Sequence, residues 1–288
     1  MQKLTKNIGN IAKKALIAII FLGLSIISFQ VSIYPPVAGS AGDASMSSTS
    51  RGSTRWGLEA IKAKDAWKVT KGTEEVIVAV IDSGIDGSIQ DLGKHMWRNG
   101  DEIPGDGIDN DNNGYVDDVT GWDFQDDRPN GNQPSGLHYH GTFVSGLIAS
   151  KYNDETGSGG VAPDISLMDL RFLDSRGRFY TSDWQKLADA IDYAVDNGAR
   201  IINLSLYASI RPPEIVHRAI KRAENNGVFV VGIAGNNGSE VGYFGCWDEV
   251  FTVGSMGKSG RVSAFSNRGE DVELVAPGSN VLSFRPGG

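Results

Sequence analysis

The sequence has little cysteine, little histidine and no excess of positive charge. Its one cysteine, Cys246, excludes any disulfide within the chain and is interpreted as a small apolar residue rather than a nucleophile. Only four histidines are available as a general base. The formal net charge of −8 argues against a nucleic-acid partner, because phosphate binding needs a basic surface.

Charge is also missing from a long stretch near the N-terminus. Four lysines precede an apolar run at 15–29, and no further charged residue occurs before Asp43. A basic start, about 15 apolar residues and then small residues are typical of a secretory signal. We therefore predict a signal peptide over 1–42, followed by a polar linker over 43–55, in a secreted, extracytoplasmic protein. The run is short for a bilayer span, and membrane attachment is expected only if this segment is retained as an anchor.

Strand and helix patterns alternate through the rest of the 288 residues, a length that suits one large domain. Short apolar runs predict buried strands at 75–82, 165–174, 200–206, 228–235 and 249–256. Helical patterns cover 142–150, 181–198 and 212–227. This alternation predicts a three-layer α/β fold, with a mostly parallel central sheet and helices on both faces. In such a sheet the site lies beyond the carboxyl ends of the strands.

Three polar residues stand where such a site would lie. Asp82 ends the first predicted strand, His140 begins a helix in HGTFVSG, and Asn236 follows the strand at 228–235. A carboxylate can hold one imidazole nitrogen so that the other acts as a base, and an amide can donate to an oxyanion. Taken alone, Asp82 and Asn236 are equally explained as turn residues, and His140 is ambiguous.

Taken together and in order, several motifs resemble those of the subtilisin-like serine proteases. These motifs are DSGID (82–86), HGTFVSG (140–146), NLSL (203–206), AGNNG (234–238) and APGSNVLS (276–283). The resemblance implies a subtilisin-like peptidase domain over 56–288 that acts on protein or peptide substrates, and we expect a monomer. It also implies that Asp82 orients the imidazole, His140 is the general base and Asn236 donates to the oxyanion.

The resemblance also implies where the substrate binds. Ser205 and Leu206 match the family segment that pairs with an extended peptide as an added strand. Tyr207 stands where the family usually has glycine, so we expect a narrowed subsite and a substrate preference that cannot be inherited. Phe143 replaces a usual second histidine, which has a structural role in the family.

The nucleophile of the family is absent from the sequence. The family serine lies in a Gly-Thr-Ser-Met-Ala motif, and neither Gly-Thr-Ser nor Gly-x-Ser-x-Gly occurs here. We therefore expect the peptidase domain to be incomplete at its C-terminus, with the serine beyond Gly288, and this chain by itself to be inactive. The alternative is a calcium-stabilised pseudoprotease that binds peptides without cleaving them.

An acidic insertion separates Asp82 from His140. Residues 101–127 hold ten acidic side chains and no lysine or arginine, and such like charges repel unless a cation compensates. Asp109, Asp111 and Asn113, followed by glycine, repeat the oxygen spacing of a calcium loop. Tyr115 could add its carbonyl and Asp117 or Asp118 a carboxylate, so we predict a structural Ca²⁺ site. The pattern departs from an EF-hand, because no glutamate stands at its twelfth position and no helix pair flanks it. The alternative is a solvated acidic surface loop.

Overall fold

The computed structural model describes residues 55–130, 136–153 and 159–287. The predicted signal peptide, and all of the predicted linker except Arg55, lie outside the described residues. None of the helices in the described ranges is long and apolar enough to cross a membrane.

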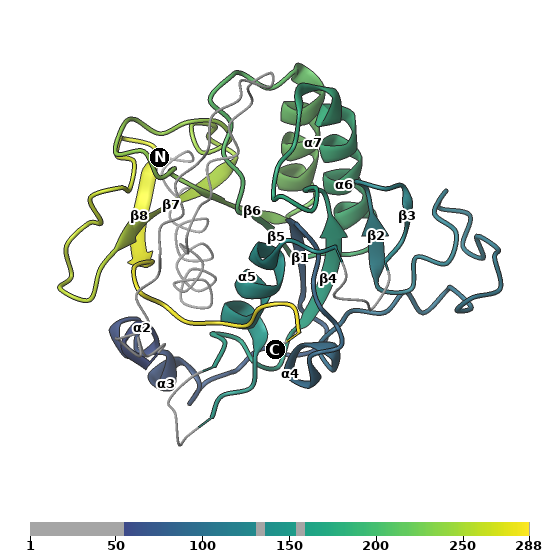
Figure 1. Ribbon diagram of the computed structural model, residues 1–288, viewed down its shortest axis with the longest axis horizontal. Helices are drawn as coiled ribbons and strands as arrows, with labels where there is room; N and C mark the ends of the chain where they lie inside the picture. The colour runs from purple at the N-terminus through teal and green to yellow at the C-terminus, as the bar shows by residue number, and fades with distance from the viewer. Residues whose placement is uncertain (1–54, 131–135, 154–158, 288) are drawn as a thin grey trace, which may run out of the picture.

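A single eight-stranded sheet organises the described residues (Figure 1). Its spatial order is β3-β2-β4-β1-β5-β6-β7-β8, and every pair is parallel except β2 with β3. The strands are β1 (Ile77–Asp82), β2 (Gly121–Asp123), β3 (Arg128–Pro129), β4 (Ser166–Arg171), β5 (Ile201–Leu204), β6 (Phe229–Ile233), β7 (Val250–Met256) and β8 (Val272–Pro277). Because β1 is central and later strands lie on both sides of it, its carboxyl end is the expected place for a site.

Helices cover both faces of this sheet. The helices are α2 (Arg55–Ala60), α3 (Ala63–Ala66), α4 (Gln90–Gly93), α5 (Tyr139–Ala149), α6 (Trp184–Asp196) and α7 (Glu214–Asn225), with a 3₁₀ turn η1 (Thr181–Asp183) before α6. Figure 1 shows α6 and α7 side by side, apart from α5. Alternate residues of β1 enter the two cores: Ala79 and Ile81 pack with α6 and α7, while Val78 and Val80 pack with α5. The predicted three-layer, mostly parallel fold is confirmed.

Local boundaries differ from the sequence prediction in ways that have physical reasons. The helix predicted from Thr142 begins at Tyr139, so His140 lies inside its first turn. Strands β2, β3 and β8 carry no continuous apolar run, and the sequence analysis missed them. Strand β8 is only partly buried at Val272–Val275, because it is the last strand of the sheet.

Candidate active site

Asp82 and His140 lie in contact at the carboxyl end of the central strand. Asp82 is the last residue of β1, and His140 lies in the first turn of α5. The imidazole Nδ1 is 2.9 Å from Oδ1 and 2.8 Å from Oδ2 of Asp82. Both side chains are buried, with 0% of Asp82 and 2% of His140 exposed. A carboxylate in this position holds the proton on Nδ1, which makes Nε2 the nitrogen that can accept one.

Ser83 joins the end of β1 to the start of α5. Its backbone N–H donates to Oδ1 of Asp82 at 2.7 Å. Its hydroxyl donates to the carbonyl of His138 at 2.8 Å and accepts the N–H of Gly141 at 2.9 Å. One buried residue therefore contacts the backbone on both sides of His140 and the carboxylate that His140 meets.

Gly141 is needed for this close approach. A Cβ at position 141 would lie 2.5 Å from the carbonyl oxygen of Gly84, far inside van der Waals contact. The glycine beside His140 thus lets the helix begin directly against the turn that follows Asp82.

Asn236 follows β6 on a loop that Asn267 holds in place. Asn236 is half-buried, and Gly235 before it has φ +110°, which favours glycine. The Asn267 side-chain oxygen accepts the N–H groups of Asn237 at 3.0 Å and Ser239 at 3.2 Å. The Asn267 N–H donates to the carbonyl of Gly235 at 2.9 Å. Asn267 is 1% exposed, so a buried amide fixes the loop that presents Asn236.

Ser205, Leu206 and Tyr207 follow β5 at the same edge of the sheet, and all three side chains are buried. Leu206 belongs to the core under α6 and α7, and the Ser205 hydroxyl accepts the side-chain N–H of Asn203 at 3.0 Å. The groups of Ser205 and Leu206 that could pair with an added strand are therefore those of the backbone.

Carboxylates converge in the acidic insertion. Oxygen atoms of Glu102, Asp109 and Asp111 all lie within 4.8 Å of one another. Asp109 accepts the backbone N–H groups of Asn113 at 3.0 Å and Gly114 at 2.8 Å, so the predicted loop closes on itself. Glu102 is 6% exposed, and the sequence analysis missed it because it lies outside the calcium-loop spacing. An oxygen-only donor set of this kind fits Ca²⁺.

Asp118 and Tyr115 lie on the inner side of this loop. The Asp118 carboxylate accepts hydrogen bonds from Asn99 and Asn113, both at 2.9 Å, and from the hydroxyl of Tyr193. Burial and this hydrogen bond raise the pKa of Tyr193. The ring of Tyr115 packs against that of Tyr193, with centroids 5.0 Å apart. Burial raises the pKa of Tyr115 to about 12. The loop is thus anchored on α6.

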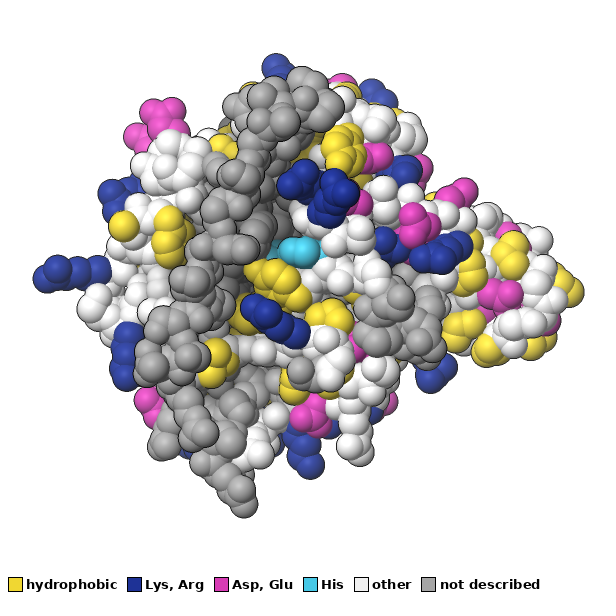
Figure 2. All heavy atoms as spheres, in the orientation of Figure 1, with side chains coloured by type: hydrophobic (Ala, Val, Ile, Leu, Met, Phe, Trp, Pro, Cys, Tyr) yellow, Lys and Arg dark blue, Asp and Glu magenta, His cyan; other side chains and the backbone are white. Residues whose placement is uncertain are grey.

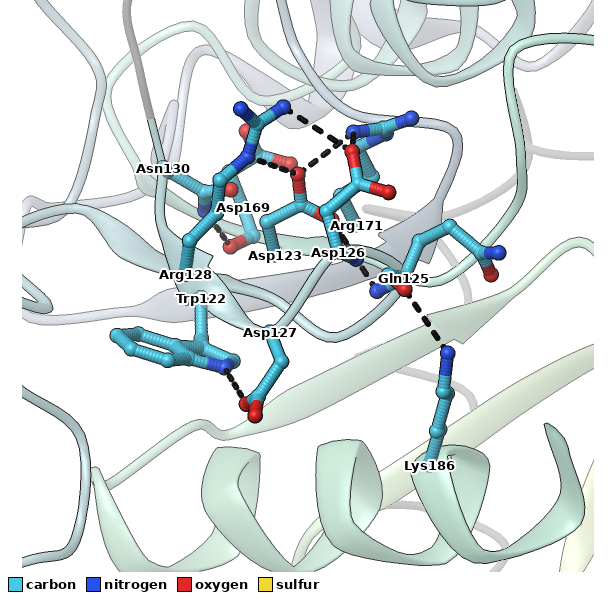
Figure 3. Close-up of polar contacts among 10 residues, drawn as sticks. All are labelled: Trp122, Asp123, Gln125, Asp126, Asp127, Arg128, Asn130, Asp169, Arg171 and Lys186. Carbon is cyan, nitrogen blue, oxygen red and sulfur yellow. Dashed lines mark hydrogen bonds and ion pairs between the residues drawn. The ribbon is translucent and has the colours of Figure 1, made fainter.

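Arginines neutralise the last part of the insertion (Figure 3). Nη1 of Arg171, at the end of β4, lies 2.6 Å from Asp123 and 2.8 Å from Asp126. Arg128 pairs with the same two carboxylates at 3.3 and 3.0 Å. The strand register places Arg171 beside Asp82 on one side and Asp123 on the other. Segment 101–127 has no positive charge of its own, and Arg128 and Arg171 therefore supply it at the C-terminal end of the segment.

Asp169 is buried two residues before Arg171. Its Oδ2 accepts the N–H of Ile85 at 3.1 Å, whereas Oδ1 has no hydrogen-bond partner among the described residues. Burial raises its pKa to about 8, and the charge of Asp123 adds to the effect. Below about pH 8, the carboxyl group of Asp169, which accepts a hydrogen bond from the turn after Asp82, is therefore neutral.

The chain is similar in sequence to a known family and to individual serine proteases. The subtilase family model matches residues 73–287. The chain is 37% identical over 219 residues to the thermophilic serine proteinase of Bacillus sp. (strain AK1), an alignment that covers 76% of this chain and 47% of that protein. It is 35% identical to the intracellular serine protease of Paenibacillus polymyxa, over 81% of this chain and 65% of that protein. It is 34% identical to the halolysin-like extracellular serine protease Nep of Natrialba magadii, over 77% of this chain and 37% of that protein. The chain thus spans less than two thirds of each of these relatives.

Proposed function

Because this chain belongs to the subtilase family, we propose that it forms most of a serine endopeptidase that hydrolyses peptide bonds by an Asp-His-Ser mechanism. The contact between Asp82 and Nδ1 of His140 carries the proposal. His140 would take the proton of the attacking serine on Nε2 and return it to the leaving amine. Asp82 would hold the imidazole in the required tautomer and stabilise its charged form.

The serine would come from residues beyond Gly288, because no family serine motif occurs within the sequence. The path of the last described residues supports this. The Gly287 N–H donates to Oδ2 of Asp86 at 2.8 Å, and the Asp86 N–H donates to the hydroxyl of Thr142 at 3.0 Å. Thr142 is two positions after His140, so a chain that continues from Gly287 starts beside the helix of the base. The 288-residue chain by itself would then be inactive.

Asn236 would donate its side-chain N–H to the oxyanion of the tetrahedral intermediate. An extended peptide would pair with the backbone at Ser205 and Leu206 as an added strand. These roles are supported by the position of both segments beyond adjacent strands, β5 and β6.

A structural Ca²⁺ would bind Asp109, Asp111 and Asn113, with the carbonyl of Tyr115 and the carboxylate of Asp118 completing the shell. The convergence of Glu102 with Asp109 and Asp111 supports this site and adds a sixth residue to it. The ion would hold the insertion folded and take no part in proton transfer.

We propose that the protein is secreted, since residues 1–42 have the pattern of a signal peptide. The relatives include both an intracellular and an extracellular protease by name. Sequencing the N-terminus of the mature protein from culture medium tests this: a start near residue 43 supports it, and intact residues 1–42 contradict it.

Hydrolysis by the longest polypeptide of the native reading frame tests the proposed function. We expect it to cleave a quenched fluorescent protein substrate, and His140→Ala to lower kcat by about 10⁴-fold or more. The matched control is His217→Ala, a histidine on α7 that pairs with Glu249 at 3.0 Å and should leave kcat unchanged. A stop codon directly after Gly288, together with tight binding of uncleaved peptide, would instead support the pseudoprotease.

A further inference from the structure

Tyr207 fills the space beside the loop that carries Asn236. It follows β5 at the edge of the sheet where the site lies, yet only 8% of it is exposed. A Cβ on Gly235 would lie 2.8 Å from Cε2 of Tyr207, and a Cβ on Gly242 would lie 2.3 Å from the same atom. The ring of Tyr207 therefore packs between the backbone at Gly235 and the backbone at Gly242. A side chain at either position would overlap the ring, so both positions need glycine.

The ring is held there from several sides. The Ala208 N–H donates to the carbonyl of Tyr243 at 2.7 Å, and the Tyr243 N–H donates back to Ala208 at 3.2 Å. Leu206, on the other side of Tyr207, is 1% exposed in the core. A Cβ on Gly235 would also lie 2.4 Å from Nδ2 of Asn267, the residue that fixes the Asn236 loop. The backbone on both sides of Tyr207 is anchored, so its ring has little freedom to swing away.

The position of the ring limits the substrate residue whose carbonyl is attacked. That carbonyl must lie about 3 Å from the amide of Asn236 to receive its hydrogen bond. The Cα of the same residue is bonded directly to the carbonyl carbon, at about 1.5 Å. Its side chain therefore starts beside the 235–242 loop and the segment after β5. If the peptide pairs with Ser205 and Leu206, the side chain of the residue whose carbonyl is attacked points inward, where the Tyr207 ring already fills the space.

We propose that Tyr207 closes the pocket for the residue on the N-terminal side of the scissile bond, and that the substrates are peptides with glycine or alanine at that position. This specificity rests on the proposed function. Figure 2 shows histidine atoms at the surface near the middle of one face, with hydrophobic side chains beside them. Selection there would come from exclusion of large side chains rather than from a pocket that binds them.

The test is a peptide series that differs only in the residue before the scissile bond: glycine, alanine, leucine or phenylalanine. With the full native polypeptide, we expect kcat/KM for the glycine and alanine peptides to exceed that for phenylalanine by about a hundredfold. Tyr207→Gly opens a space lined by Gly235 and Gly242, and it should raise kcat/KM for the phenylalanine peptide by a similar factor. Tyr207→Phe is the matched control and should keep the native order. Equal cleavage after phenylalanine and glycine by the native protein overturns the proposal.

A binding measurement separates this proposal from the proposed function. If the polypeptide cleaves neither the fluorescent protein substrate nor any of the four peptides, the protease assignment fails but the pocket is still testable in the 288-residue chain. Calorimetric titration with Ala-Ala-Pro-Gly and Ala-Ala-Pro-Phe should then give about tenfold tighter binding for the peptide that ends in glycine. Equal or tighter binding of the peptide ending in phenylalanine contradicts a closed pocket. Tyr207→Ala, compared by circular dichroism and Tm, replaces Tyr207→Gly if the glycine variant does not fold.

Discussion

The side chain of Asp82 has no exposed surface, so hydrogen bonds from the protein must replace those that its carboxyl oxygens would make with water. The imidazole of His140 and the N–H of Ser83 supply those bonds. Residue types and order indicated Asp82 and His140, because an Asp after a buried strand and a His beside glycine are distinctive. Ser83 was not indicated, since its role depends on a contact with residues more than fifty positions away.

Ser83→Ala tests this bridge between β1 and α5. The change leaves the carbonyl of His138 and the N–H of Gly141 without their partner, and a lost buried partner costs about 1–3 kcal/mol. We expect the free energy of unfolding in urea to fall by about that amount, and kcat to fall with it as His140 loses its alignment. Ser259→Ala, at an exposed position, is the control and should change stability by less than about 0.5 kcal/mol. A Ser83→Ala protein with native stability would show that the bridge contributes nothing.

The pair Asn236 and Asn267 allows the proposed oxyanion donor, Asn236, to be separated from a residue that positions its loop. Removing an oxyanion donor costs about 10²–10³ in kcat, so Asn236→Ala should show that loss with little change in KM. Asn267→Ala should reduce kcat less, because it loosens the loop by releasing the N–H groups of Asn237 and Ser239 and the carbonyl of Glu240, and it leaves the Asn236 side chain in place. The double variant should be no worse than Asn236→Ala, as expected when one residue acts through the other.

Asn237→Ala is the control for this experiment, because Asn237 is the exposed neighbour of Asn236 and should leave kcat within about twofold. Fully additive losses in the double variant would mean that Asn267 acts independently of the loop.

At the scale of elements, periodicity predicted the long helices and central strands well and the edges poorly. The helix predicted over 181–198 is observed as α6, and its apolar residues Trp184, Leu187 and Ile191 are buried while Val195 is partly buried. Its first residues differ from the prediction, because a 3₁₀ turn precedes α6 and Asp183 accepts the N–H of Tyr180 at 2.7 Å. Short edge strands such as β3 lack a continuous apolar pattern, because only their neighbours in space define them.

The acidic insertion holds two groups of carboxylates, one paired with Arg128 and Arg171 and one at the proposed calcium site, and calcium should affect only the second. At 100 times its Kd, a bound ion adds about 2.7 kcal/mol of stability, which corresponds to a rise in Tm of roughly 5–10 °C for a domain of this size. We expect EGTA to lower Tm by that amount and Asp111→Asn to abolish most of the difference. Asp126→Asn disturbs the pairs with Arg171 and Arg128, and it should lower Tm equally with and without calcium. An unchanged Tm on chelation would contradict the calcium site.

At the scale of the whole molecule, the site forms where several strand ends meet. The class of fold followed from alternating patterns, but the order of the strands did not. β1 lies between β4 and β5, so residues 82, 171 and 123 become neighbours across one end of the sheet. The sequence places these residues far apart, and no local pattern marks Asp169 or Arg171 as buried charged groups. Long-range packing decides such contacts, which explains why this network was missed.

The buried carboxyl group of Asp169 should make the stability of the whole fold depend on pH. Its pKa is about 8 in the folded protein, against 3.8 for an ordinary aspartate, so the folded state binds more protons than the unfolded state between these values. The contribution of Asp169 is therefore fully present below about pH 4 and is lost as pH rises toward 8, by up to about 1.4 kcal/mol per pH unit. Asp123 and Arg171 lie beside Asp169: the charge of Asp123 raises the pKa of Asp169, and the charge of Arg171 lowers it.

Asp169→Asn removes the titration and keeps an oxygen that can accept the Ile85 N–H. We expect the free energy of unfolding, measured in urea at fixed free calcium, to fall less steeply from pH 5 to pH 8 in Asp169→Asn than in the native protein. Asp164→Asn, an exposed aspartate nearby in sequence, should leave the native slope unchanged. If Asp169→Asn and the native protein had the same slope, Asp169 would have to be ionised in the fold, and Arg171 would then have to stabilise three carboxylates around it.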